Sequence, residues 1–135
     1  MTISQYIARF IKEYENIKIE TNHVQDGADR YGLFKSPSRE VDKNIDGSMK
    51  ITEYYQFFAK QVAVSEADRA DSDEWLEEFT YWLDDFDMIY EYPAIDGNRQ
   101  IVDISASGCP TPFEDNDGEI LYQISLTVTY MRYIE

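Results

Sequence analysis

The last part of the chain contains a long period-two pattern. Between residues 120 and 130 every second residue is apolar, and Gln, Ser and Thr occupy most positions between them. Such alternation places all the apolar side chains on one side of a β-strand, because successive side chains point to opposite faces of a sheet. We therefore predict a long strand with one buried face, which requires a second layer of structure to cover it. The apolar residues are Ile120, Tyr122, Ile124, Leu126, Val128 and Tyr130.

Residues 74–87, EWLEEFTYWLDDFD, show a helical pattern instead. At 100° per residue their apolar and acidic side chains fall on opposite arcs, and Ser72 provides an N-cap signal. In a general acid–base pair, burial or a nearby charge must shift the pKa of one carboxyl group away from that of its partner. A row of carboxylates that faces outward does not offer such an environment, so we interpret the acidic arc as a solvated face. The apolar arc is Trp75, Leu76, Phe79, Trp82, Leu83 and Phe86, and the acidic arc is Glu74, Glu77, Glu78, Asp84 and Asp85.

Weaker patterns place the remaining elements. Apolar spacing of three and four predicts a helix over residues 2–15, and alternation predicts strands over 16–24, with Ile17, Ile19 and Thr21 facing one way, and over 31–35. Residues 49–62 fit both a helix and a strand, and their aromatic and branched residues directly after an Asp-Gly turn favour the strand. Another strand is expected over 99–107, with Val102, Ile104 and Ala106 on one side. We expect loops over 36–48 and 108–119.

The order helix, strands, helix, strands predicts an α+β fold in a single domain spanning residues 1–135. We expect two layers, in which a mixed or antiparallel sheet of about four or five strands is covered on one face by two helices.

Charge limits the partners of this domain. Twelve Lys and Arg residues against 27 Asp and Glu residues give a net charge of −15. Such a surface repels nucleic-acid phosphates and anionic membranes, so we exclude DNA binding through a basic patch and expect no membrane partner. The charge remains compatible with a surface that DNA slides past, or with one that mimics DNA. Residues 1–15 have the pattern of an amphipathic helix and not of a signal peptide.

Few residues are available for catalysis or metal binding. The chain has one cysteine, Cys109, and one histidine, His23, so it cannot build a zinc site from several such ligands. A Cys109–His23 nucleophile pair is possible by composition, but a cysteine beside Gly and Pro is more typical of a loop residue. We find no phosphate-binding glycine loop and no nucleophile elbow. We therefore predict no catalytic residues and no cofactor.

One stretch has the spacing of a calcium-binding EF-hand loop. The matching positions are Asp42, Asn44, Asp46, Gly47 and Glu53. However, Pro37 and Ser38 lie where the entering helix of an EF-hand would be, and Lys50 places a positive charge at the ninth position. We favour an Asp46-Gly47 turn that leads into a strand, and we predict no metal site.

Three segments together resemble a known family. The segments that carry this similarity are NIDGSMKITEYYQFFAKQ, SDEWLEEFTYWLDD and a C-terminal strand ending in YQISLTVTYMRY. Over about residues 30–135 the chain is similar to minor capsid or tail-completion proteins of tailed phages and prophages of Gram-positive bacteria. These resemble tail terminators, α/β proteins that assemble as hexameric rings at the head-proximal end of the tail. The resemblance implies a tail-terminator-like domain, and it transfers no catalytic residues.

The resemblance also implies a function and partners. We expect a structural, non-enzymatic virion protein that forms a homo-hexameric ring, stops tail-tube growth and contacts the tail tube protein and neck or head-completion proteins. It would reside in the virion and, during assembly, in the host cytoplasm, and packaged DNA would pass without specific binding. One row of side chains on the second helix would remain exposed to solvent and line a lumen or the outer rim of the ring. This row is Glu77, Glu78, Tyr81, Asp84 and Asp85. The alternatives are an acidic DNA mimic that inhibits a nucleic-acid-binding host factor and, third, a metal-assisted hydrolase, which requires convergent buried carboxylates.

Overall fold

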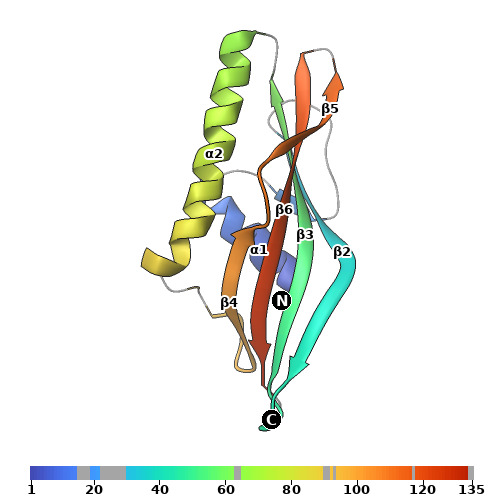
Figure 1. Cartoon of the computed structure of the whole chain (residues 1–135), viewed down its shortest axis with the longest axis vertical. Helices are drawn as coiled ribbons and strands as arrows, with labels where there is room; N and C mark the ends of the chain where they lie inside the picture. Colours follow the sequence, from blue (N-terminus) through green and yellow to red (C-terminus); the bar gives the residue numbers. More distant parts are fainter. Residues whose placement is uncertain are drawn as a thin grey trace.

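The computed structural model describes residues 1–14, 19–21, 30–62, 65–89, 92, 94–116 and 118–133. These residues form two layers, a twisted sheet and two helices that pack on one of its faces (Figure 1). The elements are α1 (Ile3–Lys12), β1 (Ile19–Thr21), β2 (Arg30–Lys43), β3 (Met49–Val62), α2 (Glu66–Ile89), β4 (Arg99–Ala106), β5 (Thr111–Asn116) and β6 (Glu119–Arg132).

The described strands form one sheet with the order β1-β2-β3-β6-β4, and β5 also pairs with β6. β1 is parallel to β2, and the other pairs are antiparallel. The predicted α+β class, with a two-layer arrangement and two helices on one face, is therefore confirmed. The sheet has six strands in the described part of the chain, because β5 adds one to the expected number.

The hydrophobic core lies between the sheet and the helices. Alternate side chains of β3 and of β6 are buried there, so the predicted period-two pattern of residues 120–130 is confirmed. From the strands, the buried apolar residues are Tyr31, Leu33, Ile51, Tyr55, Phe57, Ala59, Ile101, Ile104, Ile120, Tyr122, Ile124, Leu126, Val128 and Tyr130.

The two helices contact each other through aromatic rings. Phe10 of α1 stacks on Trp82 at 4.9 Å between ring centroids and meets Phe86 edge-on at 4.7 Å. These offset and edge-to-face geometries add to the free energy gained by burying the rings. Thr2 and Gln5 form a reciprocal capping box that starts α1. The expected apolar arc of the second helix faces the core, and its acidic arc is exposed.

The second helix begins earlier than predicted. The Ser65 hydroxyl accepts a hydrogen bond from the Asp68 N–H at 3.2 Å, and the Asp68 carboxylate accepts one from the Ser65 N–H at 3.2 Å. This reciprocal pair supplies the cap, so α2 starts at Glu66. Ser72, the predicted N-cap, is buried inside the helix.

The loop predicted over residues 36–48 is mostly wrong. Residues 36–43 continue β2 alongside β3, and only the turn at its end is irregular. The register shifts between Lys35 and Arg39, which places Pro37 in an irregularity where the strand does not need its missing N–H. Most side chains in this part of β2 are exposed, so its sequence shows no apolar alternation. The segment is a strand because its backbone pairs with β3.

Two predictions for the C-terminal half also need correction. The loop expected over 108–119 contains β5, which pairs with the first half of β6. The strand expected over 99–107 is present as β4, but a register shift between Ile101 and Asp103 changes its phase. Ile101 and Ile104 are therefore buried, whereas Val102, predicted to share a face with Ile104, is 45% exposed. The strand predicted over 16–24 is described only as β1, and Ile17 and His23 lie outside the described residues.

Candidate interaction surface

The face of the sheet opposite the helices carries an uncharged band along its two central strands. We call these ten side chains the open face, and all of them are partly exposed. None is acidic or basic, although 29% of the residues of the whole chain are charged. Both helices pack on the other face, so no helix in the described part of the chain covers this one. The open face consists of Thr52, Tyr54, Gln56 and Phe58 from β3 and Leu121, Gln123, Ser125, Thr127, Thr129 and Met131 from β6.

Hydrogen bonds between strands order the middle of the open face. The Gln123 side-chain amide donates to Gln56 Oε1 at 2.7 Å, and the Ser125 hydroxyl donates to the same oxygen at 3.0 Å. The hydroxyls of Thr52 and Thr129 lie 3.4 Å apart across the same pair of strands. Cross-strand pairs of this kind stabilise a sheet and limit the rotamers of the side chains involved. The band is therefore an ordered surface before any partner arrives.

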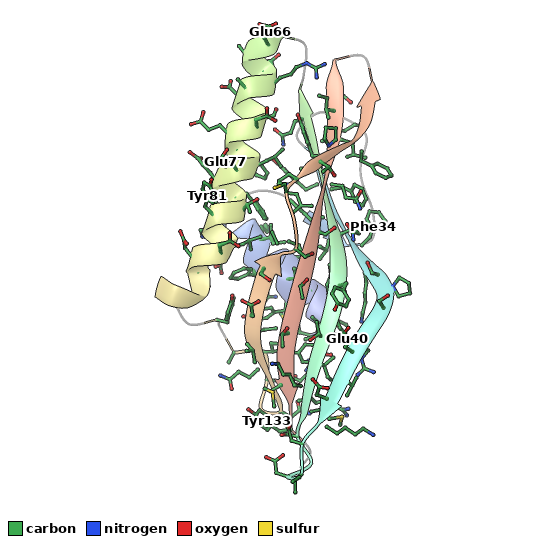
Figure 2. The ribbon with its side chains drawn as sticks, viewed as in Figure 1. Phe34, Glu40, Glu66, Glu77, Tyr81 and Tyr133 are labelled. Atoms are coloured by element: carbon green, nitrogen blue, oxygen red, sulfur yellow. The ribbon has the colours of Figure 1, made fainter. Side chains whose placement is uncertain are left out.

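One end of the open face is aromatic. Phe58 meets Phe34 of β2 edge-on at 5.5 Å between centroids and Phe113 of β5 at 5.2 Å. Together with Leu121 these rings line a hollow of about 310 Å³, and Phe113 is 58% exposed. Figure 2 labels Phe34 beside β2. No sequence pattern predicted this cluster, because its members come from four strands and β5 was expected to be a loop.

A second hollow lies next to the hydrogen-bonded region. It has a volume of about 340 Å³, and its lining includes Ser36, Tyr54, Gln56 and Ser125. No charged residue lines either hollow. Burial and then the nearby Glu40 carboxylate raise the pKa of Tyr54, so its hydroxyl remains a neutral hydrogen-bonding group at ordinary pH.

Charged residues surround this band without entering it. Lys60 Nζ and Glu119 Oε2 form an ion pair at 3.5 Å at one end. Glu40 pairs with Thr52 in the sheet register and Asp103 pairs with Thr129, which places one carboxylate on each flank. An uncharged centre inside a charged rim is the usual composition of a protein–protein interface.

A buried carboxylate, Glu53, lies on the helix-covered face of β3 and is only 3% exposed. The hydroxyls of Tyr55 and Tyr130 donate hydrogen bonds to it at 2.9 and 3.2 Å. Lys35 Nζ and Arg39 Nε approach the same carboxylate at 3.3 and 3.9 Å. Burial is the main cause that raises the pKa of both tyrosines, and the Glu53 charge adds to it. From the sequence, Glu53 was identified only as the last position of the EF-hand-like motif.

The predicted turn in the EF-hand-like segment is confirmed. Gly47 N–H donates to the Asn44 carbonyl at 3.1 Å, and Asp46 Oδ1 accepts from the backbone and the hydroxyl of Ser48 at 2.9 and 2.7 Å. These bonds lower the pKa of Asp46. Asp42 pairs with Lys50 on one face of the hairpin, whereas Glu53 points to the other face. The two ends of the motif therefore cannot surround one ion.

The acidic row of α2 is exposed, as predicted. Glu77 and Tyr81 are exposed on α2 (Figure 2), where they border a hollow that Cys109 and Tyr122 also line, and the Tyr81 hydroxyl donates to Glu77 at 2.8 Å. This hydrogen bond raises the pKa of Tyr81. Within the described residues, no group of three His, Cys, Asp or Glu side chains is placed to hold a metal ion.

Cys109 is exposed in the connection between β4 and β5. Its possible partner His23 lies outside the described residues, so the structure does not place the two together. Among the helices of the described segments, none has both the length and the apolarity needed to cross a bilayer.

The chain matches no protein-family model and no curated protein sequence. The resemblance to phage tail-completion proteins therefore rests on the sequence patterns alone.

Proposed function

We propose that this protein is a structural, non-enzymatic component of the virion of a tailed phage or prophage. Its copies form a ring, with six subunits as the resemblance implies, at the head-proximal end of the tail. The ring ends the growth of the tail tube and joins it to the neck. The observation that carries this proposal is the open face, an ordered and uncharged surface on an otherwise strongly charged domain. Such a surface supports a role in binding proteins.

The distribution of acidic residues is consistent with a surface that DNA passes without binding. Ten of the 24 residues of α2 are acidic and only Arg69 is basic, and the row from Glu77 to Asp85 faces solvent. A ring that displays these carboxylates towards its lumen or its rim would not retain packaged DNA. The partners in this proposal are other copies of the chain, the tail tube protein and neck or head-completion proteins.

The second candidate function is a DNA mimic. The same exposed carboxylates of α2 favour it, because a row of negative charges on a rigid helix can imitate phosphates and occupy a basic groove on a host protein. The two functions predict different behaviour. A monomer or dimer that binds a basic nucleic-acid enzyme tightly supports mimicry, whereas rings on the ends of tail tubes support the tail role.

Electron microscopy of particles assembled without this protein tests the proposal. We expect overlong tails or tails without heads, because tube growth would not be stopped and the neck would not attach. Adding the protein back should restore tails of normal length. Normal, joined tails in its absence would contradict the proposal.

A further inference from the structure

The open face also indicates which surface of the subunit mediates assembly. We propose that it is the contact through which neighbouring copies of this chain pack against each other. This inference rests on the proposed function, because it assigns one of the contacts between subunits of the assembly. A contact that joins the same face of two copies forms a pair, so a ring of six would contain three such pairs.

Electrostatic repulsion restricts how two copies can meet. Each copy carries a net charge of −15, and α2 contributes ten acidic residues against one basic residue. Contact through the exposed side of α2 would bring like charges together, which is unfavourable. The open face lies on the opposite side of the sheet from the helix layer. Packing through it keeps the acidic helices of both copies in solvent.

The size of this surface suits a stable contact. β3 and β6 are each 14 residues long. At about 3.3 Å per residue and about 4.8 Å per strand, these two strands cover on the order of 400 Å². The rim adds β2, of 14 residues, on one flank and β4 and β5, of 8 and 6 residues, on the other, which brings the area to on the order of 800 Å². A specific protein–protein interface buries about 800 Å² on each partner. The open face together with its charged rim is therefore large enough.

The open face contains both anchors and ordered polar groups. The hollow between Phe34, Phe58 and Phe113 can accept an apolar side chain of the neighbour, and aromatic residues at such positions often contribute most of the binding free energy. The hydrogen bonds from Gln123 and Ser125 to Gln56 hold the polar side chains in place. Less side-chain entropy is then lost on association.

The substitution Thr127→Glu tests this inference in the full-length protein. Thr127 lies in the middle of β6, opposite Tyr54 of β3. A carboxylate there would be buried in the contact without a cation to pair with, so we expect the apparent dissociation constant for self-association to rise at least tenfold. Ala70→Glu is the matched control, because it adds the same charge at an exposed position of α2. Sedimentation velocity across a concentration series at high salt measures the self-association of wild type, Thr127→Glu and Ala70→Glu.

A second variant guards against misfolding of the first. Phe113→Ala truncates a ring that is 58% exposed and not part of the core, so the fold should persist while self-association weakens. Circular dichroism checks the fold of each variant. The inference is overturned if wild type stays monomeric at all concentrations and salt levels, or if folded Thr127→Glu and Phe113→Ala assemble as wild type does.

These results separate the two proposals. Rings on tails that form equally well with Thr127→Glu would refute the contact and leave the tail function intact. Self-association lost in Thr127→Glu, together with normal tails in the absence of the protein, would support the contact and refute the tail function.

Discussion

Glu53 shows how a carboxylate can be accommodated between a sheet and its helices. Burying an isolated charge costs several kcal/mol, and this cost is offset only when hydrogen bonds and opposite charges surround it. Two tyrosine hydroxyls donate to Glu53, and Lys35 and Arg39, whose side chains are about half exposed (46% and 50%), approach it from β2. These two cations flank the register shift of β2. Glu53 therefore links the irregular part of β2 to β3 and β6.

We predict that Glu53→Gln lowers the free energy of unfolding by about 1–3 kcal/mol, the range for losing charge-assisted hydrogen bonds in a buried setting. The amide keeps one oxygen for the tyrosines but turns an N–H₂ group towards the cations. Urea unfolding followed by tryptophan fluorescence measures the change. Glu78→Gln is the control, because Glu78 is exposed on α2 and its loss should change stability by no more than about 0.5 kcal/mol. Equal unfolding midpoints for both variants would contradict this role of Glu53.

A sequence signal for this buried carboxylate did exist. Ile51, Tyr55 and Phe57 alternate along the strand predicted over 49–62, and Glu53 occupies the same phase. An acid in the buried phase of a strand indicates a partnered charge inside the protein. The identity of its partners could not be predicted, because Lys35, Arg39 and Tyr130 belong to other strands.

At the level of the element, the β2–β3 hairpin depends on one tight turn. Asn44 N–H donates to the Ser48 carbonyl at 2.9 Å, and Gly47 adopts a φ of 91°. This positive φ is unfavourable for residues with a Cβ atom. The bonds from Ser48 to Asp46 close the turn. Asp46 and Gly47 therefore have structural roles that account for their presence in the EF-hand-like motif.

We expect Gly47→Ala to destabilise the protein by about 1 kcal/mol, because alanine in the left-handed region is strained even where space is available. A Cβ added at Gly47 would meet no atom within 4 Å, so a steric clash would not contribute. Gly97→Ala is the matched control, since a Cβ there also has open space and the backbone does not adopt a positive φ. Thermal unfolding of both variants distinguishes strain from a general effect of replacing glycine. A Gly97→Ala loss as large as that of Gly47→Ala would argue against the strain.

At the level of the whole molecule, the acidic surface and the uncharged surface lie on different layers. The helix layer carries a high density of carboxylates, and the opposite face of the sheet carries an uncharged band with charges around it. If six copies assemble, their summed formal charge is 6 × −15 = −90. Repulsion between subunits then opposes assembly, and dissolved salt screens it over about 10 Å at 0.1 M.

We predict that self-association strengthens as salt concentration rises, because screening weakens the repulsion while the uncharged contact is little affected. Sedimentation velocity in buffers of low and high salt measures the change. Assemblies that dissociate as salt rises would show that attraction between opposite charges holds the subunits together.

The local pattern was sufficient for the last strand and for the amphipathic character of the second helix. Residues 120–130 and 74–87 each have one face buried against the same core, and that condition leaves a period of 2 or of 3.6 in the sequence. β5 and residues 36–43 of β2 have no such period, because they form through backbone hydrogen bonds to β6 and β3 while many of their side chains meet solvent. The aromatic hollow and the Glu53 cluster each bring together residues from several strands. Contacts of that kind arise from the pairing of distant segments, and no short stretch of the chain encodes them.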